Sequence, residues 1–305
     1  MRESRTWKLF TIHAKLTLVE NTEQLLENNP DYARDIPRTF APEPVPDNPP
    51  WGIPVAIGLW IFSVLMILII PSIFLLPYLA TLNPAILETD AIIEFAKSDR
   101  TAVLLQVLAV IPAHIFTLLA AWLVVTRNRK FSFRKTLGWA NGGVMWWHYL
   151  VFLAGFMAIA ATVSHFVPQQ DNDLVRILHS SRTVAYLIAF LATVTAPIVE
   201  EVVYRGVLYS AFQRAAGVPA AFLLVTFLFA VVHVPQYYPS YSTIFLLALL
   251  SVTLTFLRVW SKNLLPCIIL HTLFNGLQSI LIVADTISGG AKPHENAAFL
   301  FNIFK

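Results

Sequence analysis

The chain has 305 residues, of which 57% are hydrophobic and only 13% are charged. Soluble domains carry about 25% charged residues, so this composition excludes an ordinary water-soluble globule. The formal net charge of +3 gives no sign of a nucleic-acid partner, and the single cysteine excludes an intramolecular disulfide.

The first 50 residues differ from the rest because they are polar and, from Pro37 to Pro50, rich in proline. Such a segment is typical of an extended linker rather than of a packed domain. We therefore expect residues 1–50 to form a polar, Pro-rich extension on the cytosolic side of a membrane.

Long stretches without Asp, Glu, Lys or Arg follow this extension. A helix needs roughly 20 apolar residues to span a bilayer, so the chain is expected to be an all-α, polytopic membrane protein with about seven transmembrane helices. An eighth would form if the first stretch broke at Pro71 or Pro77. The charge-free stretches are Asn48 to Leu87, Thr101 to Thr126, Thr136 to Gln170, Thr183 to Val199, Ala215 to Leu257 (long enough for two spans) and Asn263 to Ala284.

The remaining boundaries follow from these stretches. Residues 51–100 are expected to hold the first span and an external connection, residues 101–284 the main helical membrane domain, and residues 285–305 a C-terminal tail. Two polar connections, Glu88 to Ser98 and Asp173 to Ser181, are expected to form short interfacial helices.

Basic residues alternate between connections, and cytosolic loops carry the excess of Lys and Arg. The extension has six basic residues, whereas Glu88 to Arg100 has two against four acids. The next connection, Arg127 to Lys135, is strongly basic, and Arg258 and Lys262 mark the last basic turn. The pattern predicts a cytosolic N-terminus, an odd number of spans and an external C-terminus. We expect the membrane to be the plasma (inner) membrane.

Two adjacent acids, Glu200 and Glu201, are the only acidic residues between Leu174 and Ala284. A charged side chain inside a bilayer costs at least about 2.5 kcal/mol, so an intramembrane acid is a candidate for function. Glu201 lies four residues before Arg205, the favourable order for an ion pair on one helix face. Glu200 points roughly 100° away from Glu201, so the two acids need not have the same role.

A hairpin should bring Glu200 close to a histidine. We expect one helix from Thr183 to Ala216, a turn at Gly217-Val218-Pro219, and a returning span. Glu200 and His233 each lie about 16 residues from that turn, so an antiparallel hairpin would place them at similar depth.

Two further polar residues, His271 and Asn275, lie four apart on one face of the last span. Together with Glu200 and His233 they suit hydrolysis, because a carboxylate can activate water while imidazole and amide groups stabilise an oxyanion. The same carboxylates and imidazoles could bind a divalent metal, at Glu200, His233 and His271. Sequence does not separate a glutamate-activated water from a metal-activated one.

The chain resembles the CAAX protease and bacteriocin-processing family of intramembrane proteases at these residues. The family's three motifs, E-E-x-x-x-R, F-x-x-x-H and H-x-x-x-N, match Glu200 to Arg205, Phe229 to His233 and His271 to Asn275 in order. The resemblance covers roughly residues 101 to 284.

The resemblance implies an endopeptidase in which Glu200 activates the water with His233. By the same match, His271 and Asn275 would hold the oxyanion, and Glu201 and Arg205 would position the site or contact the substrate C-terminus. The substrate would be a peptide or protein, prenylated in eukaryotic members and of bacteriocin type for some bacterial ones. No cofactor beyond the open metal question is implied.

A rival interpretation is a non-proteolytic membrane protein that uses the same polar cluster for binding, immunity or proton relay. Internal repeats and broken helices would favour a transporter, and neither is evident in the sequence. Three other histidines, His114, His148 and His165, are expected to be hydrogen-bonded core residues.

Overall fold

A computed structural model of the chain describes residues 43–82, 89–167, 170 and 173–287. The chain divides into two compact units, Met1–Glu43 and Pro44–Lys305, and all of the helices below belong to the second. Most of the extension expected at residues 1–50, and residues 288–305 of the expected tail, lie outside the described residues.

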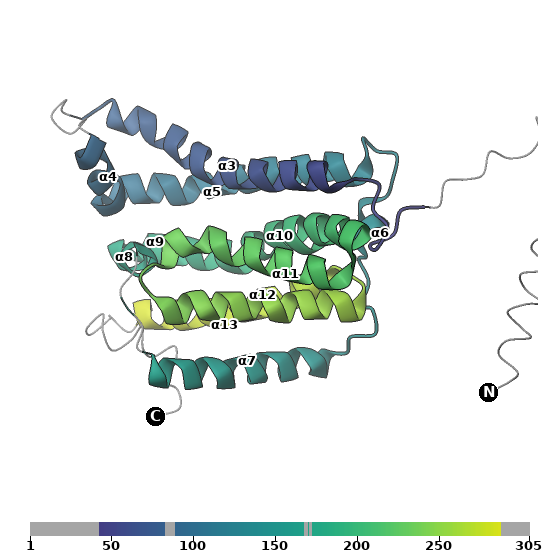
Figure 1. Cartoon of the computed structure of the whole chain (residues 1–305). Helices are drawn as coiled ribbons and strands as arrows, with labels where there is room; N and C mark the ends of the chain where they lie inside the picture. Colours follow the sequence, from purple (N-terminus) through teal and green to yellow (C-terminus); the bar gives the residue numbers. More distant parts are fainter. Residues whose placement is uncertain (1–42, 83–88, 168–169, 171–172, 288–305) are drawn as a thin grey trace, which may run out of the picture. The chain divides into compact units, whose positions relative to one another are not determined.

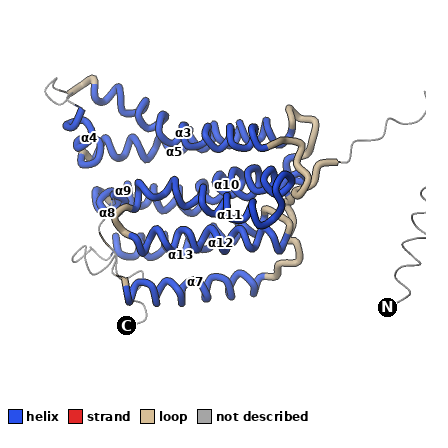
Figure 2. Tube along the Cα trace, viewed as in Figure 1, coloured by secondary structure: helices blue, strands red, loops and turns tan. Residues whose placement is uncertain are grey.

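The described residues form helices joined by short connections, without a strand among them (Figure 2). Six helical segments are long and apolar enough to cross a membrane, so the predicted all-α membrane architecture is confirmed and the chain is an integral membrane protein. The six are Ile53–Leu79 (α3), Arg100–Thr126 (α5), Trp146–Phe166 (α7), Arg182–Tyr237, Tyr241–Ser261 (α12) and Leu265–Ile287 (α13).

The longest segment, Arg182–Tyr237, contains two crossings. Its 56 residues would extend roughly 80 Å as one helix, far more than the hydrocarbon thickness of about 30 Å. Gly217 interrupts it with φ 82° and ψ 171°, and the two arms run back along each other (Figure 1). Within the described residues the count of crossings therefore reaches seven. Helix α3 continues through Pro71 and Pro77, so neither proline divides it into two spans.

The first arm of this hairpin is an irregular helix. Two π-helical segments flank the turn of α-helix that carries the acidic pair, and Pro197 explains the first of them. Proline has no backbone N–H and its ring crowds the preceding turn, so the Ala196 N–H bonds to Leu191 and the Ala192 carbonyl loses its helical partner. The segments are Arg182–Phe190 (α9), Leu191–Thr195 (η2), Ala196–Glu201 (α10), Val202–Leu208 (η3) and Tyr209–Tyr237 (α11).

Helix starts and stops follow from capping residues in the loops. The Asp99 side chain accepts the Ala102 N–H at 2.8 Å at the start of α5, and Ser181 accepts the Val184 N–H at 3.1 Å at the start of α9. These side chains satisfy backbone donors that a helix start leaves unpaired. At the other end, α12 stops at Lys262, whose backbone is left-handed.

The helices pack as neighbouring pairs. Helix α3 packs along α5, the second arm of the hairpin along α12, and α13 along α9 and η2, while α7 lies at one edge (Figure 1). The short helices Thr89–Ser98 (α4) and Asp173–Ser180 (α8) lie where the sequence predicted them. Many large apolar side chains point outward, as expected of a surface covered by lipid.

The turn between α12 and α13 is held by a glycine-rich connection that follows Phe133–Leu137 (α6). The Gly138 carbonyl accepts the Leu264 N–H at 2.9 Å. Gly142 has φ +56°, and a Cβ there would collide with the carbonyl oxygen of Ser261. Gly143 has φ +82° but open space around it. A side chain at Gly143 would therefore meet backbone strain alone, whereas one at Gly142 would meet strain and a steric clash.

We expect Gly142→Ala to destabilise the protein more than Gly143→Ala does. Both changes place a Cβ on a left-handed residue, which costs about 1–2 kcal/mol, but only Gly142→Ala adds a clash, worth roughly 1–3 kcal/mol more. Thermal unfolding in detergent measures the difference. Equal melting temperatures for the two variants would show that the α12–α13 turn can shift and relieve the clash at little cost in stability.

Candidate active site

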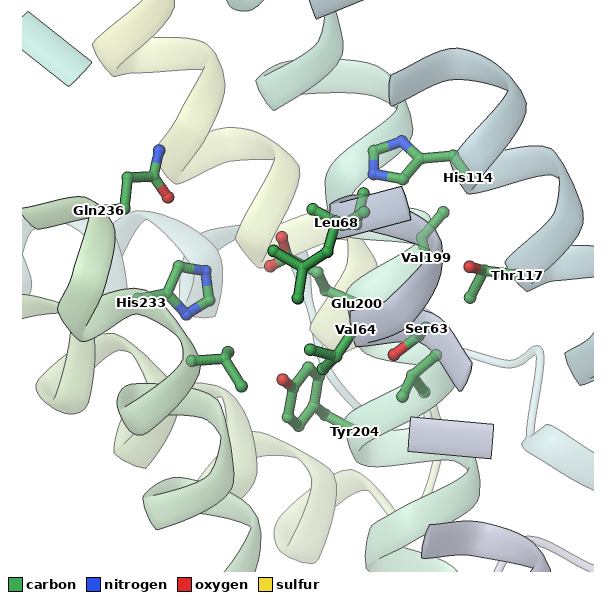
Figure 3. A pocket seen from close by; sticks show the side chains of 13 residues that line it. Ser63, Val64, Leu68, His114, Thr117, Val199, Glu200, Tyr204, His233 and Gln236 are labelled. Carbon is green, nitrogen blue, oxygen red and sulfur yellow. The ribbon is translucent and has the colours of Figure 1, made fainter. Parts of the chain in front are cut away.

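A cavity of about 230 Å³ opens between α3, α5, the α10–η3 segment and α11 (Figure 3). Six aliphatic side chains form part of its wall, which suits a site at membrane depth. The other seven lining residues carry polar groups: Ser63, His114, Thr117, Glu200, Tyr204, His233 and Gln236.

Glu200 and His233 line this cavity from the two arms of the hairpin, as Figure 3 shows. The Glu200 side chain is 25% exposed, in contrast with the neighbouring Glu201, which is fully buried. Because the two acids point in different directions from one helix, Glu200 can meet a water molecule or substrate, while Glu201 meets only protein.

Glu201 is the buried anchor of the site. Its Oε1 accepts a hydrogen bond from Arg205 Nη1 at 2.9 Å, within an ion pair whose side chains are both 0% exposed. Arg205 also donates to the Ser251 carbonyl and hydroxyl at 3.0 and 2.7 Å and to the Thr255 hydroxyl at 3.3 Å. The guanidinium lies over the ring of Phe229, 4.8 Å from its centroid. These contacts tie η3 to α11 and α12.

His271 links the two acids. Its Nδ1 is 2.8 Å from Glu201 Oε1, and its Nε2 is 3.8 Å from Glu200 Oε2. The arginine keeps Glu201 as an acceptor-only carboxylate, so we assign the Nδ1 proton to His271 as the donor. The Nε2 of the neutral ring then presents a lone pair to Glu200. His271 itself does not line the cavity but lies behind Glu200.

His233 has the same tautomer for a different reason. Its Nδ1 is 2.7 Å from the carbonyl oxygen of Phe229, and a carbonyl only accepts. The ring lies against Phe229, with centroids 4.7 Å apart. In its neutral form, His233 therefore presents an Nε2 lone pair as its free polar atom.

His114, on α5, also belongs to the cavity wall, although the sequence suggested only a core role. Its Nδ1 is 2.9 Å from the Thr195 hydroxyl, which donates its own proton to the Leu191 carbonyl at 3.2 Å. Thr195 must therefore accept from His114 Nδ1–H, and the Nε2 of the neutral ring keeps its lone pair. In the sequence, the only feature that could have indicated a role for His114 in the site was its position inside a charge-free span.

Asn275 lies one turn after His271 but does not line the cavity. Its amide nitrogen donates to the Ala192 carbonyl at 2.9 Å, the carbonyl that Pro197 deprives of a helical partner. The amide thus satisfies a backbone group that would otherwise be unpaired in an apolar interior. The oxyanion role implied for Asn275 by its motif would require this hydrogen bond to break or be shared.

The divalent metal considered at Glu200, His233 and His271 finds no ready-made ligand set. Among the described residues, no group of three His, Cys, Asp or Glu side chains is arranged to hold a metal ion. His271 uses its Nδ1 on Glu201, and of the three residues only Glu200 and His233 line the cavity.

Comparison with known proteins adds one finding. Residues 182–277 match the model of the family described as type II CAAX prenyl endopeptidase Rce1-like. This agrees with the resemblance to CAAX proteases that the three motifs indicated. The match contains the acidic pair, His233, His271 and Asn275, whereas α3 and α5 lie outside it. Neither the curated proteins nor the solved structures gave a match.

Proposed function

We propose that this chain, whose residues 182–277 form an Rce1-like domain of the type II CAAX prenyl endopeptidases, hydrolyses peptide bonds with a water molecule activated by Glu200. The observation that supports this most is the shared cavity. Of the two adjacent acids, Glu200 is the one that lines the cavity, and His233 lines the same cavity from the other arm of the hairpin.

The tautomers assigned above support a base-catalysed attack. Glu200 and the Nε2 of His233 are both acceptors, so together they can hold a water molecule by its two hydrogens. Glu200 would take one proton as the water oxygen bonds to the peptide carbonyl carbon. When the tetrahedral intermediate collapses, the carbon–nitrogen bond breaks, and that proton passes from Glu200 to the departing amine.

The buried groups would position this base. The His271 ring would pack beside Glu200 and restrict its position, and Glu201 would fix the tautomer of His271, as a carboxylate commonly does for a catalytic histidine. Arg205 uses its donors on Glu201, Ser251 and Thr255, and it does not line the cavity. We therefore assign it to positioning rather than to contact with a substrate C-terminus.

The substrate class we propose is a peptide or protein segment presented at the membrane, C-terminal (CAAX-like) or of bacteriocin type. The aliphatic wall formed by residues such as Val64, Leu68 and Val232 would accommodate apolar side chains beside the scissile bond, and a lipid on the substrate is one variant to test.

The test is hydrolysis by the purified full-length protein in liposomes. Peptides with a CAAX-like C-terminus, farnesylated and unmodified, are incubated in heavy-oxygen water, and products are identified by mass spectrometry. We expect one new carboxylate carrying one heavy oxygen atom. Binding of the peptides without any cleavage would favour the non-proteolytic rival.

We also propose that the N-terminus is cytosolic. The basic connection after α5 and the α12–α13 turn lie at the same end of the helices (Figure 1), and positive charge favours the cytosolic side. The only native cysteine, Cys267, is buried, so single exposed cysteines can report orientation.

An impermeant maleimide should label Glu94→Cys in intact cells and Arg134→Cys only after the membrane is opened. Glu94 lies on α4 and Arg134 on α6, both exposed and near opposite ends of the bundle. Labelling of Arg134→Cys in intact cells would reverse the proposed orientation and leave the chemistry untouched.

A further inference from the structure

The cavity is rich in acceptors and poor in donors. In their neutral forms, His114 and His233 have their Nδ1–H groups bonded to Thr195 and Phe229, and Glu200 as a carboxylate only accepts. Amide hydrolysis creates an oxyanion, which needs a hydrogen-bond donor aimed at it. The two oxyanion donors implied by the motif match are both engaged elsewhere: His271 Nδ1–H bonds to Glu201 and the Asn275 amide bonds to Ala192, and neither residue lines the cavity.

Tyr204 supplies a donor of the right kind. Its phenol oxygen accepts a hydrogen bond from the Trp60 indole N–H at 3.1 Å. Indole only donates, so this bond occupies a lone pair of the phenol and leaves the phenol's proton free. Tyr204 also lines the cavity, one helical turn after Glu200, and Figure 3 shows both side chains around the same space.

The other hydroxyls on the cavity wall have already used their protons. Ser63 donates to the Trp60 carbonyl at 2.7 Å, and Thr117 donates to the Ala113 carbonyl at 2.9 Å. The Gln236 amide is exposed, so water competes for it. Among the described residues that line the cavity, Tyr204 is therefore the buried hydroxyl with a donor to spare.

The Tyr204 ring is also held in place. It is 5% exposed, and it meets Phe229 edge-on with centroids 5.1 Å apart. A donor that is fixed before the reaction needs no reorganisation when charge develops, which is why preorganised donors are effective. Donation from Trp60 further polarises the phenol O–H and strengthens it as a donor.

We propose that the Tyr204 hydroxyl donates a hydrogen bond to the carbonyl oxygen of the scissile peptide and stabilises its oxyanion; this inference rests on the proposed hydrolase function. As the water oxygen bonds to the carbonyl carbon, the carbonyl π electrons move to oxygen, where the phenol O–H meets them. Tyr204 keeps its proton throughout, and the amine leaves with the proton that Glu200 removed.

The experiment compares Tyr204→Phe with wild type and with Tyr149→Phe in liposomes. Tyr149 is buried on α7, away from the cavity, and controls for loss of a buried phenol oxygen. We expect Tyr204→Phe to lower kcat by roughly 10²–10³-fold, the effect of removing one oxyanion donor, with KM nearly unchanged. Tyr149→Phe should retain wild-type kcat.

Two further measurements separate catalysis from folding. In Tyr204→Phe, the affinity for a tetrahedral phosphonate analogue of the substrate should fall. The affinity for a non-cleavable peptide that resembles the ground state of the substrate should not change. Trp60→Phe, which keeps the phenol but removes its orienting partner, should lose part of kcat with the same KM.

Wild-type kcat in Tyr204→Phe, or a change confined to KM or to melting temperature, would overturn the role of Tyr204 and leave the hydrolase proposal standing. Absence of cleavage by the wild-type protein would instead overturn the hydrolase proposal and this inference with it.

Discussion

Replacing Glu200 by glutamine is expected to lower kcat for peptide cleavage by roughly 10²–10⁴-fold, the range that general acid–base groups contribute. Glutamine has nearly the same shape, but its amide cannot take a proton from water. Because the side chain is 25% exposed toward the cavity, the change leaves no buried charge unpaired. The measurement is single-turnover cleavage in liposomes.

The matched control is Glu94→Gln, which removes an exposed acid from α4 and should cleave at the wild-type rate. Melting temperatures of both variants should stay close to that of wild type, since neither acid supports the buried ion pair. Undiminished cleavage by Glu200→Gln would remove the proposed base and require another group, with His233 as the next candidate, to activate the water.

The membrane architecture could be predicted because lipid imposes simple rules on sequence. Charge-free stretches of sufficient length predict spans, and a glycine two residues before a proline predicts where the long segment folds back. Gly217 does adopt a non-helical backbone with φ of 82°, and the hairpin brings Glu200 and His233 to one cavity. Helical spacing was enough here because both residues lie on one continuous hairpin.

The irregularity of the first arm could be anticipated only in part. Pro197 is visible in the sequence, and a proline inside a span predicts a disturbed helix. Spacing alone does not reveal which carbonyl is freed or which side chain satisfies it. That Asn275 donates to the Ala192 carbonyl depends on how α13 packs against η2, a contact between segments far apart in the chain.

Motif analysis also could not predict the contribution of α3 and α5. His114 of α5 lines the cavity and Trp60 of α3 donates to Tyr204, but nothing in their spacing connects them to the acidic pair. Their placement follows from the packing of α3 and α5 against η3. Tyr204 is part of the first motif segment. That its hydroxyl proton is free to donate can be inferred only from the hydrogen bond that it accepts from Trp60.

The largest expected effect on stability comes from Arg205→Met. Arg205 is fully buried and holds Glu201, Ser251 and Thr255, so its loss leaves an uncompensated carboxylate inside the bundle. Breaking a buried pair by removing one partner destabilises by about 3–5 kcal/mol. Denaturant unfolding in mixed micelles measures the loss, and Arg134→Met, at an exposed arginine, should be neutral.

The double variant Glu201→Gln/Arg205→Met distinguishes a charge effect from a packing effect. If the destabilisation comes from the stranded carboxylate, neutralising Glu201 as well should recover part of the lost stability, and the two changes should be strongly non-additive. His271 would still find an acceptor in the glutamine oxygen, so its ring can stay in place. Additive losses would instead mean that Arg205 acts mainly through its packing on Phe229 and its bonds to α12, and that Glu201 carries little charge in the folded protein.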